Sequence, residues 1–202
     1  MRADDMDHGR RQLMRGLAAG LAGSAFGGVA HAHQVAGRLD PPLPPPALPV
    51  RWHDGSQRPL ADVLQGRVTA LQMMFTTCTA TCPIQGALFA SLRDRLGSAQ
   101  PDAQLISLSL EPLVDTPKAL GEWLKRHGQG HGQARARWLA GSPDIRSLTA
   151  WVDFLKSAQP GPDRHTGQVY LFDRRGRLAL RTVDFPAPEQ VLGMLDGLAK
   201  LR

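Results

Sequence analysis

The sequence VTALQMMFTTCTATCP, residues 68–83, contains both cysteines of the chain and sets the pattern of the elements around them. Residues 68–75 are apolar and strand-like, a polar, threonine-rich turn follows, and Pro83 opens a segment with helical spacing. The thiols of Cys78 and Cys82 are therefore expected at a strand-to-helix junction. Free backbone N–H groups and the helix dipole at such a junction favour negative charge, which lowers a thiol pKa and raises the thiolate fraction.

The C-x-x-x-C spacing of Cys78 and Cys82 leaves several functions open. A structural disulfide that closes a loop of about five residues would stabilise the fold by only roughly 2 kcal/mol, less than one that closes a long loop. A paired-thiol site is favoured instead. It is either a set of metal ligands or a redox couple, and the spacing alone does not separate the two.

The rest of the chain alternates between strand and helix patterns. Further strands are expected at residues 104–110, 138–140, 168–172 and 178–182, and helices at 83–97, 117–127, 142–155 and 188–201. Parallel β-α-β units followed by a β-hairpin and a final helix indicate an α/β fold. We therefore predict a thioredoxin-like three-layer sandwich, with a central mixed sheet, a C-terminal hairpin and flanking helices.

The carboxyl ends of the strands are the usual ligand-binding edge of an open α/β sheet, and both cysteines are expected there. The hairpin that closes the sheet can bring the residue before its first strand to the same edge, and His165 holds that position. Two thiolates and one imidazole suit Cu(I) and can hold Cu(II), whereas Zn²⁺ would require a fourth ligand or water. The sequence thus indicates a copper site of Cys78, Cys82 and His165.

Other histidines are weaker candidates for metal ligands. His53, His127 and His131 lie in polar or glycine-rich stretches that are expected to form exposed loops. At most, an accessory metal site is expected among them.

Two enzymatic alternatives use the same cysteines. A metal-independent thiol-disulfide oxidoreductase would use Cys78 and Cys82 as its redox pair, although the usual redox spacing is C-x-x-C and His165 would have no role. A peroxidase of the peroxiredoxin type would need one peroxidatic cysteine of low pKa, and neither flanking sequence matches such a site. The metal-binding interpretation is favoured over both, so the protein is not expected to be primarily an enzyme.

Residues 1–32 resemble a twin-arginine export signal, with Arg10 and Arg11 before a weakly apolar, glycine-rich stretch. Small residues ending at Ala32 predict cleavage there. An uncleaved signal would instead attach the protein to a membrane, and a stretch of about 17 residues is marginal as a span. Export predicts a periplasmic location, where conditions favour disulfides, so a reductant or a bound metal is implied for the cysteines.

Residues 33–49 are rich in proline and are predicted to be an extended linker, and residues 50–202 the folded copper-binding domain. The chain has 202 residues, of which 42% are hydrophobic, enough for one core. Its net charge of +6 invites a nucleic-acid interpretation. No run of Lys and Arg interleaved with aromatic residues is present, so no nucleic-acid partner is expected.

Three motifs of the chain resemble the SCO/SenC family of copper metallochaperones. They are FTTCTATCP at residues 75–83, SLSLEPLVDTP at 107–117, and His165 followed by VYLFD at 169–173. Together they extend over nearly the whole predicted domain in the order of the family. The resemblance implies a thioredoxin-like fold and copper bound by Cys78, Cys82 and His165.

The resemblance also implies a part in building the binuclear copper A centre of cytochrome c oxidase. The protein would deliver copper, reduce the target cysteines, or both. The implied partners are the copper A subunit or another periplasmic cuproprotein, together with a copper-donor chaperone or a thiol reductant. Asp115 matches an acidic position of the family, where it would act near the site or in partner docking; a helix N-cap is the alternative role.

Overall fold

The computed structural model describes residues 36–97, 99–128, 136–156 and 166–201. The chain divides into two units, Met1–His33 and Gln34–Arg202, and the first, with the predicted export signal, lies outside the described residues. Within the described ranges, no helix has the length and apolar character needed to cross a membrane.

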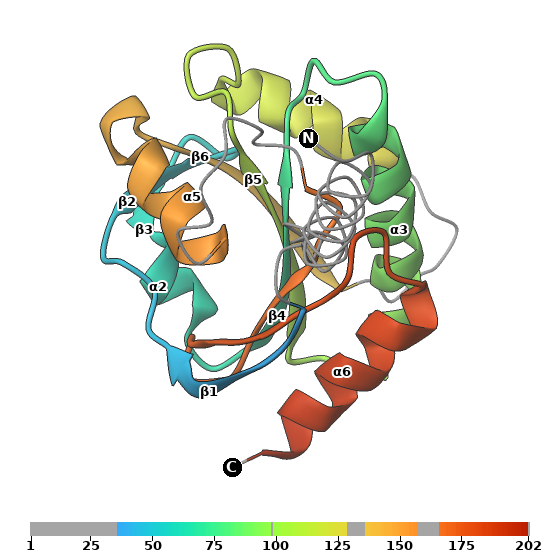
Figure 1. Cartoon of the computed structure of the whole chain (residues 1–202). Helices are drawn as coiled ribbons and strands as arrows, with labels where there is room; N and C mark the ends of the chain where they lie inside the picture. Colours follow the sequence, from blue (N-terminus) through green and yellow to red (C-terminus); the bar gives the residue numbers. More distant parts are fainter. Residues whose placement is uncertain (1–35, 98, 129–135, 157–165, 202) are drawn as a thin grey trace, which may run out of the picture. The chain divides into compact units, whose positions relative to one another are not determined.

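The described part of Gln34–Arg202 is built on one mixed sheet of eight strands in the order β1-β8-β7-β4-β5-β6-β2-β3 (Figure 1). Strands β4, β5 and β6 are parallel, and the other neighbouring pairs are antiparallel. The strands are β1 (Gly37–Leu43), β2 (Pro49–Trp52), β3 (Gln57–Pro59), β4 (Val68–Met74), β5 (Ala103–Ser109), β6 (Arg137–Pro143), β7 (Tyr170–Phe172) and β8 (Leu178–Arg181).

Helices cover both faces of this sheet, so the predicted α/β sandwich of three layers is confirmed. Helices α3, α4 and α6 pack on one face, and α2 and α5 on the other (Figure 1). The helices are α2 (Leu60–Leu64), α3 (Thr81–Leu96), α4 (Pro117–His127), α5 (Leu148–Lys156) and α6 (Pro188–Lys200). A short 3₁₀ turn, Ile145–Ser147, precedes α5, so that helix begins later than its sequence pattern predicts.

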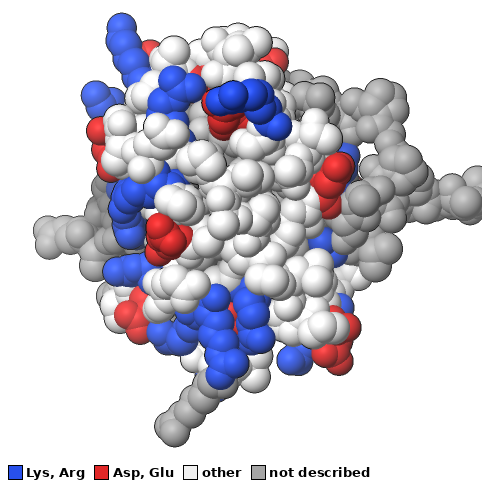
Figure 2. All heavy atoms as spheres, turned by 90° about the vertical axis from the view of Figure 1, so that its left-hand side faces the viewer, with Lys and Arg blue, Asp and Glu red and all other residues white. Residues whose placement is uncertain are grey.

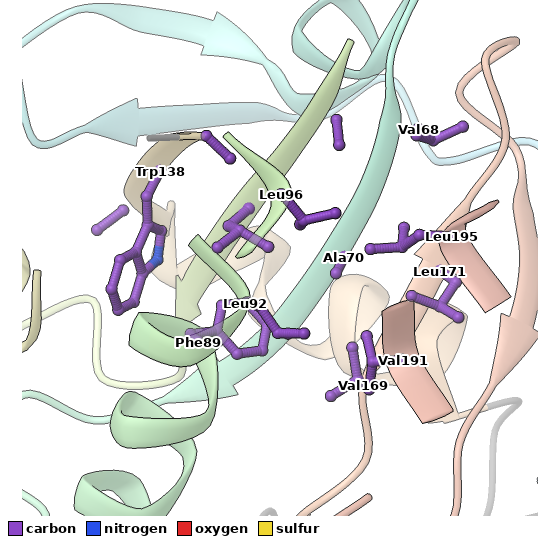
Figure 3. Close-up of a cluster of buried hydrophobic side chains, with 14 of the residues drawn as sticks. Val68, Ala70, Phe89, Leu92, Leu96, Trp138, Val169, Leu171, Val191 and Leu195 are labelled. Carbon is purple, nitrogen blue, oxygen red and sulfur yellow. The ribbon is translucent and has the colours of Figure 1, made fainter. Parts of the chain in front are cut away.

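Strand β4 lies at the centre of the sheet and is buried along its whole length. Val68 and Ala70 face the core beneath α3 and α6, whereas Leu71 and Met73 face the core beneath α2 and α5. Figure 3 shows the first of these cores, where Leu92 of α3 and other apolar side chains gather around the strands. Burial on both faces explains why apolar residues of β4 point to both sides of the sheet and do not alternate with exposed ones; its two polar residues, Thr69 and Gln72, are buried as well.

The chain reverses direction between β7 and β8 through a tight turn at residues 173–176. Gly176 has φ of 71°, a conformation that favours glycine. The Asp173 carboxylate accepts hydrogen bonds from the backbone N–H groups of Arg175 and Arg177, both at 2.9 Å. This arrangement is the predicted C-terminal hairpin, and it places β7 next to β4.

The predicted linker at residues 33–49 differs from the structure in part. Gly37–Leu43 forms β1, which pairs antiparallel with β8 at the edge of the sheet, and Pro49 begins β2. An edge strand tolerates proline because one side of it needs no N–H donors. The register shifts between Arg38 and Leu43, where the prolines stand. Composition predicted an extended chain correctly, but it did not reveal that this chain joins the sheet.

Candidate metal centre

The two cysteines lie where β4 ends and α3 begins, as the sequence predicts. Cys82 is in the first turn of α3 and is 3% exposed, and its Sγ accepts a hydrogen bond from the backbone N–H of Phe75 at 3.4 Å. Cys78 is half-buried in the preceding turn, with its Sγ 3.7 Å from the Thr81 hydroxyl oxygen. Both are free thiols. Two reduced thiols can serve either as a redox couple or as a pair of metal ligands.

The Cys78 thiol loses its proton more readily than an ordinary cysteine does, because its pKa is lowered. Its partial burial raises the pKa, but hydrogen bonds from the backbone N–H groups of Cys82 and Ala80, the Cys82 thiol and the Thr81 hydroxyl outweigh burial and lower the pKa to about 6. The pKa of an ordinary cysteine thiol is 9.0. The free amides at the start of α3 thus act as the sequence predicts.

The Cys82 thiol has the opposite character. Burial raises its pKa to about 12, and the neighbouring Cys78 thiolate adds to this because a second negative charge beside the first is unfavourable. The hydrogen bond from Phe75 works in the other direction but is too weak to compensate. At neutral pH the pair therefore carries one negative charge, on Cys78, and one proton, on Cys82.

A buried carboxylate holds the turn that carries Cys78. Asp115 is fully buried and accepts hydrogen bonds from the Thr76 hydroxyl, from the Thr76 backbone N–H at 3.3 Å and from the Ser109 hydroxyl at 2.6 Å. A second contact lies nearby, where the Thr77 hydroxyl donates to the Glu111 carboxylate at 2.8 Å. These bonds connect the turn after β4 to the segment after β5, so they fix the turn against the sheet.

The alternative role of Asp115 as a helix N-cap is wrong. Thr116 is the N-cap of α4, and its hydroxyl accepts from the Ala119 backbone N–H at 3.3 Å. Asp115 instead faces the cysteine turn through Thr76. The sequence placed Asp115 near the site only through the family resemblance, and it gave no signal for Thr76 beyond its place beside the cysteines.

His165, the third predicted ligand, lies outside the described residues. Its neighbours Thr166 and Gly167 come just before β7, which runs antiparallel to β4. Tyr170 pairs with Leu71, so the residues before Tyr170 extend toward the end of β4, where the cysteine turn begins. The topology thus brings the chain next to His165 to the edge that carries the thiols.

A loop that the sequence did not single out holds this neighbouring segment. The Asp184 carboxylate accepts from the Gly167 backbone N–H at 2.7 Å, and the Phe185 N–H donates to the Gly167 carbonyl at 2.9 Å. A Cβ at Gly167 would lie 2.9 Å from the Phe185 ring, so only glycine fits there. Phe185 also lines a groove of about 270 Å³ with Ile84 of α3, which connects this loop to the helix of Cys82.

The other predicted histidines do not join the cysteines. His127 is the last residue of α4 and packs its ring 4.6 Å from that of Trp123, so the expectation of an exposed loop is wrong for this residue. Burial, with Arg126 nearby, lowers the pKa of His127. His53 is half-buried beside β6, and His131 lies outside the described residues. Within the described ranges, no group of three or more His, Cys, Asp or Glu side chains is placed to hold a metal ion.

The asymmetry of the thiols predicts a pH dependence of alkylation. Because the pKa of Cys78 is lowered to about 6, its reaction with iodoacetamide should rise with pH to a midpoint near 6, while Cys82 stays unmodified. Cys82→Ala removes a hydrogen-bond donor and should move the midpoint upward, whereas Cys82→Ser keeps a donor and should move it less. Mass spectrometry of peptides alkylated over a pH series measures these rates. A midpoint near 9 in the unaltered chain would refute the account.

The contacts of Asp115 predict a stability difference between neighbouring residues. Asp115→Ala leaves the Thr76 N–H and two hydroxyls without their acceptor in a buried site, and should lower the free energy of unfolding by roughly 3 kcal/mol. Thr116→Ala removes an N-cap and should lower it by about 1 kcal/mol. Urea denaturation of the two variants provides the comparison. If both substitutions lowered the free energy of unfolding equally, Asp115 would contribute no more to stability than the N-cap of α4 does.

Comparison with known proteins gives a consistent result. The family model described as SCO1/SenC matches residues 52–200. No curated protein matches the chain. Among solved structures, a SCO1/SenC family lipoprotein from Bacillus anthracis is 20% identical, with a TM-score of 0.64 over 80% of this chain and 99% of that one.

Two further structures are similar. Bradyrhizobium japonicum ScoI with copper bound is 18% identical, with a TM-score of 0.58 over 81% of this chain and 99% of that one. BsSco, a member of the Sco family of cytochrome c oxidase assembly proteins with an identified disulfide switch, is 22% identical, with a TM-score of 0.61 over 80% and 97%. At these identities the structures establish a shared fold. Because the family model covers most of the sequence, the chain belongs to the SCO1/SenC family.

Proposed function

We propose that this protein is a periplasmic copper-binding metallochaperone that serves the copper A site of cytochrome c oxidase. The observation that carries the proposal is the pair of free thiols at the start of α3, on the carboxyl edge of the sheet. Membership of the SCO1/SenC family supports it, as do the copper bound in Bradyrhizobium japonicum ScoI and the oxidase-assembly role of the family of BsSco.

The site suits a soft metal ion as cargo. The Cys78 thiolate offers negative charge at neutral pH, and Cys82 follows when a metal ion displaces its proton. His165 is the proposed third ligand, since its neighbours reach the same edge through β7 and the Asp184–Phe185 loop. Two thiolates and an imidazole would hold Cu(I) and accept Cu(II). A thiol pair of this kind can release its metal to a partner that offers more ligands.

Thiol reduction is a second candidate function, and the contrast between the two thiols favours it. The Cys78 thiolate would attack a target disulfide, forming a mixed disulfide and releasing one target thiolate. Cys82, once deprotonated, would attack the Cys78 sulfur and release the second target thiolate, leaving a Cys78–Cys82 disulfide. The target gains two electrons and this protein loses two. The same reaction would prepare a target's cysteines for copper, so delivery and reduction can serve one recipient.

Apolar side chains surround the cysteine edge and would meet the recipient. Ile84 of α3 is 59% exposed, Leu113 and Val114 within the Glu111–Asp115 turn are 79% and 52% exposed, and Phe185 is 48% exposed. Exposed apolar residues that gather at a site are typical of a protein-binding surface. The proposed partner is the copper A subunit or another periplasmic cuproprotein, with a copper-donor chaperone or a thiol reductant acting upstream.

Export of the chain is part of the proposal. Residues 1–32 carry the features of a twin-arginine signal, and the Bacillus anthracis relative is a lipoprotein, a class of proteins attached to membranes. Either cleavage after Ala32 or retention as an anchor would leave the cysteine domain in the periplasm.

Copper affinity of a histidine variant tests the proposal. His165→Ala should weaken Cu(II) binding to the reduced chain by about 10- to 100-fold, because the harder ion depends more on imidazole, and should weaken Cu(I) binding less. His131→Ala is the matched control and should bind copper as the unaltered chain does. Competition titration with chromophoric chelators measures both affinities.

A disulfide-reduction assay on the same variants separates the two candidate functions. His165→Ala should reduce a model disulfide at the normal rate, because thiol exchange does not require the ring. Full Cu(II) affinity in His165→Ala, combined with normal reduction, would remove the third ligand and favour the oxidoreductase. Equal loss of copper affinity in His131→Ala would place the metal elsewhere.

A further inference from the structure

A groove with an apolar floor and a basic rim is formed by residues 38–42 and 173–201, away from the cysteines in the sequence. It has a volume of about 390 Å³ and lies between β1, β8, the β7–β8 turn and the end of α6. Leu180, Met194 and Leu198 line its floor, and Leu201, which is 50% exposed, lies at its mouth. The proposed copper function uses none of these residues.

Arginine dominates the rim of this groove. Four arginines line it, Arg38, Arg174, Arg175 and Arg177, against one acidic residue, Asp173. Arg177 pairs with Asp173 at 2.7 Å, and Arg174 pairs with Asp102 at 3.0 Å. Arg38 and Arg175 are exposed and have no ion pair within the described part of the chain. The rim therefore keeps positive charge that no acidic side chain of these residues neutralises.

The groove is at the opposite end of the sheet from the thiols. The cysteine turn follows the end of β4, whereas the β7–β8 turn lies where β4 begins, because β7 is antiparallel to β4. Figure 1 shows β1 and the end of α6 at the lower end of the described domain. Figure 2 shows the side of the domain that carries α2 and α5, where Lys and Arg side chains lie along the top and left and in a cluster at the bottom.

We propose that this end of the domain docks on an anionic phospholipid bilayer. Arginine pairs with phosphate through two parallel N–H donors, and the apolar groove can receive the glycerol and upper acyl region of a lipid. A soluble anion would match the arginines but would not use the apolar floor. In this orientation the cysteine turn faces away from the bilayer, accessible to a partner.

Hydrogen–deuterium exchange of the full chain tests this surface. Vesicles of phosphatidylglycerol and phosphatidylcholine should slow exchange in peptides covering residues 173–178 and 196–201, and leave residues 75–80 unchanged. Vesicles of phosphatidylcholine alone should leave exchange unchanged in all of these peptides. Because the readout is local, insertion of residues 1–32 in the vesicles does not imitate the result. Unchanged exchange at the groove with the anionic vesicles would overturn the proposal.

Paired charge variants complete the test. Each basic residue near an anionic surface contributes about 5-fold to binding, so Arg38→Gln with Arg175→Gln should raise the lipid concentration for half-protection by roughly 30-fold. The control pair on α4, Lys125→Gln with Arg126→Gln, changes the net charge of the protein by the same amount. It should leave the lipid concentration for half-protection unchanged. If both pairs of substitutions raised the lipid concentration for half-protection equally, binding would depend on the net charge of the protein and not on this groove. Protection by poly-glutamate equal to that by the vesicles would assign the surface to an acidic protein instead. Either result would overturn the proposal.

Discussion

The hydrogen bonds of the Asp115 carboxylate are the constraint on which the site depends. Strand β4 ends at Met74, and the residues up to α3 are held by these bonds together with the contacts of Phe75 with Cys82 and of Thr77 with Glu111. Asp115 accepts from both the backbone and the hydroxyl of Thr76, and from Ser109, so one buried group ties the ends of two parallel strands together. A buried carboxylate is stable here because each of its oxygens has donors. The turn can then present the Cys78 sulfur to the free amides at the start of α3.

This placement gives the two thiols different properties from one local structure. Cys78 receives hydrogen bonds from the helix start and holds negative charge, while Cys82 is buried against the core and keeps its proton. In the two proposed functions, a soft metal ion or a target disulfide would meet the half-buried Cys78 thiolate first, and either would then require Cys82 to lose its proton. Copper transfer and thiol reduction would thus share the same first contact, so the geometry suits either proposed function. The third ligand decides between them.

Much of the fold could be predicted because its elements have strong local signals. The buried run at β4, Pro117 after an N-cap threonine, and the turn ended by Gly176 each have one favoured structure. The strand β1 could not be predicted, because its pairing with β8 depends on residues more than a hundred positions away and its prolines indicate an extended linker equally well. His127 was assigned to a loop because of the glycines that follow it, but it ends α4, where its ring packs on Trp123 one turn earlier in the same helix. Only its contact with Gly86 of α3 is tertiary.

Within the site, the sequence identifies the cysteines but not what supports them. Their spacing and the following proline are visible in the sequence, whereas the contact of Asp184 with Gly167 and the close fit of Phe185 against Gly167 arise from the fold. X-ray absorption spectroscopy of the reduced, copper-loaded chain tests the central claim most directly, because it reports the atoms bound to the metal. The account predicts sulfur scattering from two thiolates together with the multiple-scattering pattern of one imidazole. A spectrum with nitrogen and oxygen neighbours but no sulfur would contradict it.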